Sequence, residues 1–206
     1  LPSHIGLVGP LPPPYGGMAN QTQQLAELLR SEGLQVSLVQ TNPPYFPQWI
    51  SNLPVVRAFF RLLPYLYALW RLAGRCDVMH VMANSGWSWH LFAAPAVWIA
   101  KLRKVPVVVN YRGGEAETFL ARSARSVRIT MCQASRLIVP SGFLKAVFTR
   151  FDMPVSVVPN IIDIARFNNP APYRTKRNHL LVARNLEPIY DNETAIRAFF
   201  LVHRSN

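Results

Sequence analysis

Short apolar runs rich in β-branched residues recur along the chain, and amphipathic helical patterns lie between them. Strands separated by helices pair in parallel, because each helix brings the chain back to the end of the sheet at which the previous strand began. The next strand then runs in the same direction. The alternation therefore predicts an α/β, Rossmann-like domain with helices on both faces of a parallel sheet. We expect strands at 5–8, 36–39, 78–81, 105–109, 137–139 and 155–158, and helices at 20–31, 55–75, 91–101, 115–134 and 143–151.

The character of the sequence changes after residue 158. Residues 159–178 are rich in Pro and Asn and lack a sustained period, as an interdomain linker does. An apolar run at 180–183 and a helix from about Asn192 then open a second α/β unit. We therefore expect a Rossmann-like N-terminal domain at 1–158, a linker at 159–178 and the start of a second domain at 179–206. Since the chain begins without Met and stops inside a helical pattern, we expect a fragment.

The charge of the chain narrows the class of partner. Its 22 Lys and Arg residues outnumber its 10 Asp and Glu residues, which gives a formal net charge of +12. This excess favours an anionic partner, either nucleic acid, a lipid surface or a phosphorylated substrate. The basic residues follow no recognised nucleic-acid-binding motif, so we expect no nucleic acid partner. Cys76 and Cys132 lie far apart without clustered His residues, which predicts neither a disulfide framework nor a metal site.

Residues 5–20, with the sequence IGLVGPLPPPYGGMAN, place a strand, a proline-rich turn and a Gly-Gly pair directly before a helix. Gly16 and Gly17 let backbone N–H groups approach a ligand closely, and a helix N-terminus adds free donors and partial positive charge. The loop thus predicts a site for a phosphorylated or nucleotide-linked ligand. The alternative is that the two glycines only shape the turn. A dinucleotide-dependent oxidoreductase is disfavoured, because the G-x-G-x-x-G fingerprint is absent and QTN at 40–42 offers no acid for a ribose.

Three short motifs lie along the chain in a fixed order. Residues 14–18 read PYGGM, residues 157–163 read VVPNIID and are followed by Arg166 and Phe167, and residues 183–184 read AR. In these motifs the chain resembles the retaining glycosyltransferases of family 4, whose GT-B fold pairs two Rossmann-like domains across a cleft. The resemblance covers the whole chain but only about the first half of the family. It implies transfer of a sugar from a sugar nucleotide to an acceptor, with neither a metal nor a cofactor.

The resemblance also implies which residues contact the donor. The first domain would bind the acceptor and the second most of the sugar nucleotide, with Gly16 and Gly17 reaching the donor diphosphate. Arg184 would stabilise negative charge on the leaving nucleoside diphosphate, a role suited to a permanently charged guanidinium. The alternative for Arg184 is an ion pair with Glu187. Family members commonly carry a Lys a few residues later, where this chain has Tyr190, which can hydrogen-bond a phosphate but cannot neutralise it.

The fourth expected strand runs into NYRGGE at 110–115, which puts Arg112 near a position where the family often has His. By resemblance, Arg112 holds the donor phosphate or an acidic acceptor, and Glu115 orients the acceptor from the carboxyl end of a strand. The alternatives are a solvent-exposed loop arginine and an acid of the first helical turn. We expect His80 to be a core histidine. The residues expected to be catalytic are Arg184, Arg112 and Glu115, and those expected to contact the acceptor are Tyr15, Asn84, Ser85, Arg112 and Glu115, with His4, His90 and Glu117 as further candidates.

No acidic residue occurs between Gly33 and Cys76, a stretch that contains an apolar, aromatic helical pattern. On an ideal helix at about 100° per residue, the arginines of this pattern fall within an arc of roughly 80°. Such a helix suits the surface of an anionic membrane but not a span, since Arg61 and Pro64 interrupt the apolar run. The alternative is an ordinary helix that buries its apolar side in the sheet. The arginines are Arg57, Arg61, Arg71 and Arg75, and the opposite side holds Phe59, Leu62, Leu63, Leu66, Leu69 and Trp70.

These features predict a glycosyltransferase of cell-envelope, exopolysaccharide or glycolipid synthesis, with a nucleotide-sugar donor and a glycan or lipid-linked acceptor as partners. We expect a cytoplasmic protein, or one held peripherally at the inner face of the plasma membrane. The alternative is a non-catalytic half of a split or truncated transferase that only binds acceptor or anionic membrane. By resemblance, most of the donor-binding domain lies beyond Asn206, so we expect the isolated chain neither to bind a sugar nucleotide tightly nor to turn over.

Overall fold

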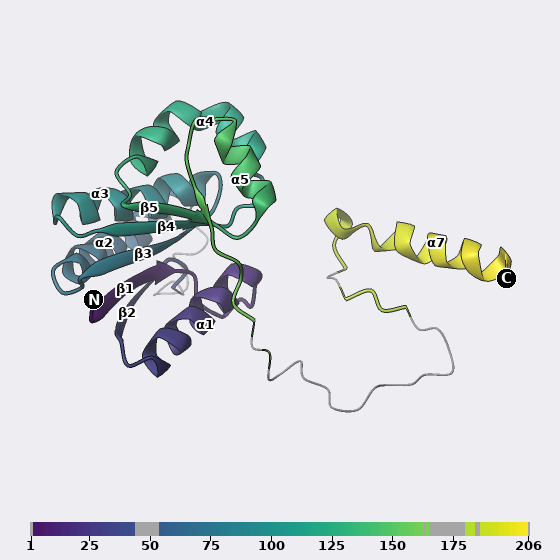
Figure 1. Ribbon diagram of the computed structural model, residues 1–206, viewed down its shortest axis with the longest axis horizontal. Helices are drawn as coiled ribbons and strands as arrows, with labels where there is room; N and C mark the ends of the chain where they lie inside the picture. Colours follow the sequence, from purple (N-terminus) through teal and green to yellow (C-terminus); the bar gives the residue numbers. More distant parts are fainter. Residues whose placement is uncertain (1, 44–53, 163, 165–179, 184–185, 206) are drawn as a thin grey trace. The chain divides into compact units, whose positions relative to one another are not determined.

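The computed structural model describes residues 2–43, 54–162, 164, 180–183 and 186–205. The chain forms two compact units, Leu1–Ile162 and Asp163–Asn206. The first unit contains the sheet and the helices around it, and the second contains a short helical segment (Figure 1). The domain boundaries expected from the sequence, at 158 and 178, stay predictions.

A six-stranded sheet forms the centre of the first unit, in the order β2-β1-β3-β4-β5-β6, and every pairing in it is parallel. Every strand expected before residue 159 is present, so the predicted α/β, Rossmann-like fold is confirmed. The chain leaves β1 toward β2 on one side and later reaches β3 on the other, and open α/β sheets bind ligands at such a reversal. The strands are β1 His4–Gly9, β2 Gln35–Gln40, β3 Val78–Ala83, β4 Val107–Tyr111, β5 Arg136–Val139 and β6 Ser156–Val157.

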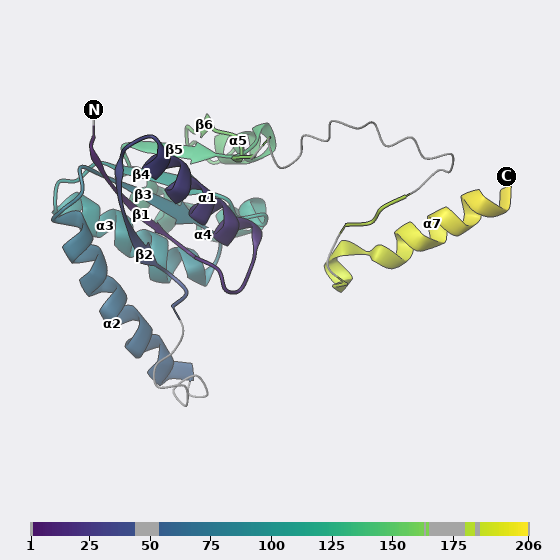
Figure 2. The same cartoon turned by 90° about the horizontal axis from the view of Figure 1, so that it is seen from below.

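In the described part of the chain, helices cover the two faces of the sheet unequally. Helix α1, Gly17–Ser31, packs on one face, where Leu7, Ala26 and Met82 form a small buried cluster. Four helices cover the other face, as the two views of the ribbon show (Figures 1 and 2). Right-handed crossovers explain this division, because only the connection through α1 runs toward the β2 edge. The four helices are α2 Pro54–Ala73, α3 Ala94–Leu102, α4 Ala116–Met131 and α5 Gly142–Thr149.

The larger core lies between the sheet and these four helices. Leu69 of α2, Val81 of β3, Val97 of α3, Val109 of β4 and Leu120 of α4 are almost completely buried there. Each such side chain contributes about 1.5–3 kcal/mol to folding by leaving water. This core holds β3 and β4 rigidly, and the loops at their carboxyl ends are positioned with them.

The second unit contains the 3-10 turn η3, Pro188–Tyr190, and helix α7, Asn192–Ser205. The helix begins where the sequence predicts it. The strand expected at 180–183 is wrong, because these residues have no regular structure and are exposed. A strand is stable only when neighbouring strands pair with its N–H and C=O groups. The described residues of this unit provide no such neighbour.

Candidate functional site

Two hollows open at the edge of the sheet where its parallel strands end. The first, which we call the aromatic pocket, has a volume of ≈ 570 Å³ and lies beyond β3 and β4. The second, the loop pocket, has a volume of ≈ 280 Å³ and is lined by Gly17, Met18, Gln21, Arg112, Pro140 and Asn160. A third hollow of ≈ 600 Å³ lies at the start of β5 and β6, and none of the expected site residues lines it.

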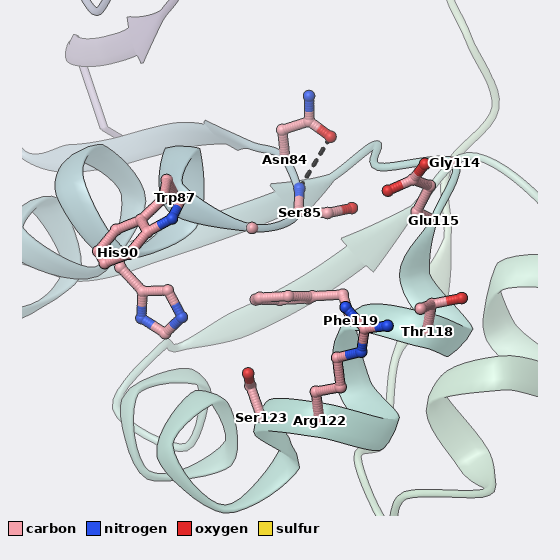
Figure 3. Close-up of a pocket in the computed structure, with 11 residues that line it drawn as sticks. Asn84, Ser85, Trp87, His90, Gly114, Glu115, Thr118, Phe119, Arg122 and Ser123 are labelled. Carbon is pink, nitrogen blue, oxygen red and sulfur yellow. Dashed lines mark hydrogen bonds between the residues drawn. The ribbon is translucent and has the colours of Figure 1, made fainter.

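One wall of the aromatic pocket comes from the loop and the helical turn after β3 (Figure 3). Gly86 in this loop has a φ of +65°, a left-handed conformation that glycine adopts without steric cost. Helical structure then begins at Trp87 and contains a π-helical turn, η2, Trp89–Ala93, which runs into α3. The sequence predicts a helix only from 91, and the earlier start brings Trp87 and His90 to the pocket. π-helical turns are frequent at functional sites.

Three aromatic rings form a continuous series that begins on this wall and ends at Phe119 of the opposite wall. Trp87 is 78% exposed, and its ring meets His90 edge-on at a centroid distance of 6.3 Å. His90 in turn meets Phe119 of α4 edge-on at 5.9 Å. Edge-to-face contacts of this kind hold aromatic rings in defined orientations. We call Trp87, His90 and Phe119 the aromatic wall.

The opposite wall comes from the first turns of α4. Glu115 is the N-cap residue of this helix, and Thr118, Phe119 and Arg122 follow on the pocket side at helical spacing (Figure 3). Glu115 and Arg122 carry opposite charges but lie seven residues apart, about 10 Å along a helix. Neither takes part in the ion pairs found among the described residues. The pocket therefore presents a carboxylate and a guanidinium that do not neutralise each other.

Asn84 and Ser85 join the two walls at the ends of the strands. The backbone N–H of Ser85 donates to Asn84 Oδ1 at 2.8 Å, and the hydroxyl oxygens of Ser85 and Tyr111 lie 2.9 Å apart. Burial raises the pKa of Tyr111, so its hydroxyl stays protonated at neutral pH. A Cβ atom at Gly113 would lie 2.7 Å from the Tyr111 hydroxyl oxygen and 2.8 Å from Asn84 Oδ1. Any larger residue at position 113 therefore requires Ser85, Asn84 or Tyr111 to shift.

Substitution of Gly113 tests this packing. We expect Gly113→Ala to destabilise the chain by about 1–3 kcal/mol, because the added methyl group displaces Ser85 and Asn84. The matched control is Gly114→Ala, where a Cβ meets nothing within 4 Å, and we expect it to change stability by less than about 1 kcal/mol. Urea denaturation of both variants measures the difference. Equal stabilities of the two variants would show that the close contacts at Gly113 relax without cost.

Helix α1 presents its N-terminus to the loop pocket. Gly16 is the N-cap residue, in an extended conformation with a φ of −158°, and no side chain caps the helix. The first turn contains no acidic residue, so the partial positive charge of the helix end is not neutralised there. A Cβ atom added at Gly16 or Gly17 would meet nothing within 4 Å, and neither residue has a positive φ. Among the described residues, neither packing nor backbone conformation requires glycine at these positions.

Arg112 connects the loop pocket to three other side chains. Its Nη1 donates to Asn160 Oδ1 and, at 3.4 Å, to Gln21 Oε1, while its Nε donates to Asn110 Oδ1 at 3.2 Å. Burial lowers the pKa of the half-buried guanidinium, which still stays charged at neutral pH. Arg112 is thus a positioned cation rather than a solvent-exposed loop arginine.

Gln21 of α1 fixes the chain just after β6. Its Nε2 donates to the carbonyl oxygen of Ile161 at 3.0 Å, and its Oε1 accepts from the N–H of Ile161 at 3.0 Å. Asn160 is held at the same place by Arg112. The first residues of the expected linker are therefore bound to α1 and to the carboxyl end of β4.

His80 lies next to this network. Asn110, which is only 3% exposed, accepts a hydrogen bond from Arg112 with its Oδ1, so its Nδ2 donates to His80 Nε2, 3.2 Å away. Burial, and to a smaller extent the charge of Arg112, lower the pKa of His80 to about 4. His80 is therefore neutral at pH 7, as suits the core histidine that the sequence predicts.

The two pockets bring together six of the expected site residues. Asn84, Ser85, Glu115 and the further candidate His90 line the aromatic pocket, whereas Gly17 and Arg112 line the loop pocket. The roles expected for these six stay predictions. In the part of the chain that the structure describes, no three His, Cys, Asp or Glu side chains gather as a metal site would require.

The other expected site residues lie elsewhere. Gly16 caps α1, and Tyr15 before it is 82% exposed and lines neither pocket. Tyr190 lies in η3 of the second unit. Arg184 lies outside the described residues.

Several side chains of the two pockets were not expected from the sequence. Trp87 is one of them, although its place just after a strand and a glycine is a usable indication. Asn110, which lines neither pocket but accepts a hydrogen bond from Arg112, was also not expected, although a single amide within the apolar strand VVVNY indicates a specific hydrogen-bonding role. Arg122 and Phe119 have no comparable sequence pattern. The proline-rich loop is also fixed by an unexpected residue, since Asn42 Nδ2 donates to the carbonyl of Leu11 at 2.8 Å.

Helix α2 differs from the basic helix that the sequence predicts. Nε and Nη2 of Arg61 donate to the carbonyl oxygen of Thr41 at 3.1 and 2.8 Å, and the guanidinium lies over the ring of Phe92 at 5.4 Å. Arg61 is thus engaged within the chain instead of facing a membrane. Arg71 remains exposed, and Arg75 is exposed in the turn after the helix. The side chain of Arg57 lies outside the described residues.

The apolar side of α2 is divided between the core and the surface. Leu62, Leu66 and Leu69 pack into the core as one arc of the helix. Leu63 and Trp70, expected on that same side, are exposed instead, because the buried arc is centred on Tyr65 and Leu69. The exposed residues form a row that we call the α2 stripe, Phe60, Leu63, Tyr67 and Trp70, which are 56%, 61%, 63% and 46% exposed.

Basic side chains border the α2 stripe. The guanidinium of Arg71 lies 5.9 Å from the ring centroid of Tyr67, and that of Arg103 lies 4.7 Å from the ring centroid of Trp70. Among the described helices, none is both long and apolar enough to cross a membrane.

Comparison with known proteins identifies the class of this chain. The sequence model of Glycosyltransferase Family 4 matches residues 15–166, which include the Gly-Gly loop, both pockets and the start of the linker. The chain therefore belongs to glycosyltransferase family 4. No curated protein sequence matches the chain.

Among solved structures, the chain is similar to Phytolacca americana UGT2, solved in complex with UDP-2fluoro-glucose and pterostilbene. The two share 12% sequence identity with a TM-score of 0.47, over 79% of this chain and 55% of that one. The chain thus spans about half the length of this solved glycosyltransferase.

Proposed function

We propose that this protein is the acceptor-binding half of a retaining glycosyltransferase of cell-envelope, exopolysaccharide or glycolipid synthesis. It receives a sugar from a nucleotide-sugar donor and directs it to a glycan or lipid-linked acceptor. The observation that carries the proposal is the pair of pockets at one edge of the sheet. The aromatic pocket offers flat rings and the Glu115 carboxylate, and the loop pocket offers Arg112 beside an uncapped helix N-terminus.

The two pockets suit the two substrates. In retaining transfer the bond between the anomeric carbon and the diphosphate breaks, and the acceptor oxygen bonds to that carbon on the same face. The acceptor proton passes to an oxygen of the departing diphosphate. Arg112 and the N–H groups of α1 supply positive charge for the diphosphate, and Glu115 accepts a hydrogen bond that orients an acceptor hydroxyl. For Arg184 and Tyr190 we keep the donor-binding role that the family resemblance implies as part of this proposal.

The Gly-Gly pair supports a donor at the loop pocket. If Gly16 and Gly17 only shaped the turn, a side chain there would clash or the backbone would require a positive φ, and neither is the case. Glycine is a favoured N-cap residue, which accounts for Gly16, and close approach of a ligand to the backbone is a reason for a second glycine at Gly17.

A donor screen tests the proposed function. The complete open reading frame that contains this chain is expressed, and release of nucleoside diphosphate is measured from UDP-glucose, UDP-N-acetylglucosamine and GDP-mannose, with membrane extract supplying acceptors. We expect release that requires one donor and the extract together, and no release by the 206-residue chain alone. Absence of release with every donor, with glycan binding retained, would instead support a non-catalytic half that only binds acceptor.

The α2 stripe supports a peripheral position of the enzyme at the cytoplasmic face of an anionic membrane. Aromatic and aliphatic side chains exposed on one helix face insert into the interfacial region of a bilayer, and neighbouring basic groups attract anionic headgroups. Arg71 and Arg103 lie directly beside the stripe. A lipid-linked acceptor would then be presented at the same surface.

Flotation with liposomes measures this attachment. We expect Leu63→Ser combined with Trp70→Ser to reduce recovery with anionic vesicles at least about tenfold, because two apolar side chains no longer enter the interface. The control combines Ile129→Ser with Phe143→Ser, two exposed apolar residues of α4 and α5, and should float like the parent. Equal recovery of the parent with neutral and anionic vesicles, or equal losses in both variants, would contradict membrane attachment through α2.

A further inference from the structure

The aromatic pocket contains a cation whose role the proposed function leaves open. Arg122 lines the pocket and takes part in none of the ion pairs among the described residues. Nearby arginines do find acidic partners, since Arg128 lies 3.8 Å from Asp152 and Arg150 lies 2.6 Å from Glu117. Arg122 is thus available to a ligand, and its planar guanidinium matches a carboxylate or a phosphate with two parallel hydrogen bonds.

The aromatic wall restricts the rest of the ligand. Trp87 lines the pocket and is 78% exposed, while the nearby Trp89 is buried in the core. The indole of Trp87 contacts the His90 ring edge-on, which favours one orientation of its flat surface. A pyranose ring places several C–H bonds on one face, and such a face packs against an aromatic ring. A pocket volume of ≈ 570 Å³ accommodates one or more sugar residues.

The charges in the pocket also determine the direction in which a ligand binds. Glu115 lies at the start of α4 and Arg122 about two turns further along it, with the aromatic wall beside them (Figure 3). An anionic group is repelled by Glu115 and attracted by Arg122, whereas hydroxyl groups can donate to Glu115. A ligand with an anion at one end and hydroxyls at the other is therefore held in one direction.

From these observations we infer that the acceptor of this enzyme is an acidic sugar. Its ring lies on Trp87, its carboxylate or phosphate pairs with Arg122, and a hydroxyl at its other end donates to Glu115. The inference rests on the proposed function, because it names the class of acceptor that the transferase uses. The anionic group has two sources that Arg122 does not distinguish, a uronic acid carboxylate and the phosphate of a lipid-linked sugar.

Binding by the 206-residue chain tests the inference without a donor or turnover. The indole N–H resonance of Trp87 is followed by NMR during titration with methyl glucuronide, methyl glucoside, glucose 6-phosphate and inorganic phosphate. We expect an anionic sugar to bind at least about tenfold more tightly than methyl glucoside, since a charge-assisted hydrogen bond is gained. Preference for methyl glucuronide identifies a uronic acid acceptor, and preference for glucose 6-phosphate identifies a phosphate-bearing one.

Two variants distinguish direct pairing of the anionic group with Arg122 from attraction by the positive charge of the whole chain. Arg122→Gln should remove the preference for the anionic sugar over methyl glucoside. Arg125→Gln removes the same charge one turn further along α4, outside the pocket, and should preserve the preference. The inference is overturned if methyl glucoside binds as tightly as both anionic sugars, if Arg122→Gln keeps the preference, if inorganic phosphate binds as tightly as the sugars, or if no sugar binds.

The test of the acidic acceptor and the test of the proposed transferase activity can give different results. A complete protein without transferase activity, whose chain still selects the anionic sugar through Arg122, would refute the proposed function and keep the binding site. A complete protein that transfers to neutral acceptors, with Arg122→Gln as active as the parent, would keep the proposed function and refute the acidic acceptor.

Discussion

The Arg112→Gln variant of the complete enzyme is expected to transfer sugar about 10²–10³-fold more slowly than the parent, since one positioned donor to a developing anion is worth that much. Glutamine keeps a polar side chain near Asn110 and Asn160 but lacks the positive charge that the diphosphate requires. Arg112→Lys keeps the positive charge but lacks the planar guanidinium, so its transfer rate should lie between those of the parent and of Arg112→Gln. Steady-state kinetics with the donor found in the screen measure kcat and KM for each.

Arg136→Gln provides the control for this substitution. Arg136 lies at the start of β5, at the far end of the strands, and donates to the carbonyl oxygen of Ser135 at 3.2 Å. Its replacement lowers the net charge by the same amount as Arg112→Gln and should leave kcat within about twofold, as a distant surface charge does. Thermal unfolding of both variants shows whether loss of the Arg112 hydrogen bonds also affects folding. An Arg112→Gln enzyme as active as the Arg136→Gln enzyme would exclude Arg112 from the donor site.

The stability of the chain is expected to fall in weak acid because of His80. Its pKa is about 4 in the folded state and about 6.5 in an unfolded chain. Between these values the unfolded state binds more protons than the folded state, so stability increases with pH through this window. A change from pH 7.5 to pH 4 should therefore cost about 2–3 kcal/mol from this residue, at about 1.4 kcal/mol for each pKa unit.

Urea denaturation at a series of pH values isolates the effect of His80. The parent and His80→Gln share all carboxylates, so the acid titration of those groups cancels when their free energies of unfolding are subtracted. The difference should be flat above about pH 7 and should change by 2–3 kcal/mol, at the parent's expense, by about pH 4. A difference that stays constant over this range would show that His80 becomes protonated as easily in the folded chain as in the unfolded one.

The sheet could be predicted from the sequence because a strand buried on both faces is a continuous apolar run. Residues 107–109 and 137–139 are examples, and both became strands. The amphipathic pattern also predicted α1, but placed its start at residue 20, whereas the helix begins at Gly17. The run at 180–183 has the same composition but no strand, because pairing depends on neighbours that the local sequence does not contain.

The pockets could be predicted only in part. Glu115 and Arg112 were expected because they directly follow a strand, where ligands bind in parallel sheets. Arg122 comes from the second turn of a helix, and it reaches the pocket only because α4 begins beside the loop after β3. The π-helical turn that brings Trp87 and His90 to the same cavity has no sequence pattern. Contacts with the sheet and with neighbouring helices likewise determine which side of α2 is buried. The α2 stripe therefore differs from the apolar helix face that the sequence predicts.

The hydrogen bonds of Arg112 have a thermodynamic consequence for movement of the linker. The same guanidinium that lines the loop pocket also holds Asn160, and Gln21 beside it holds Ile161. Under the proposed function, a diphosphate at Arg112 competes with Asn160 for its donors, so donor binding weakens the attachment of the linker to the first unit. Linkage is reciprocal, so release of the linker must raise donor affinity by the same factor. Binding of the donor at Arg112 and release of Asn160 from the same guanidinium would thus be two measures of one equilibrium.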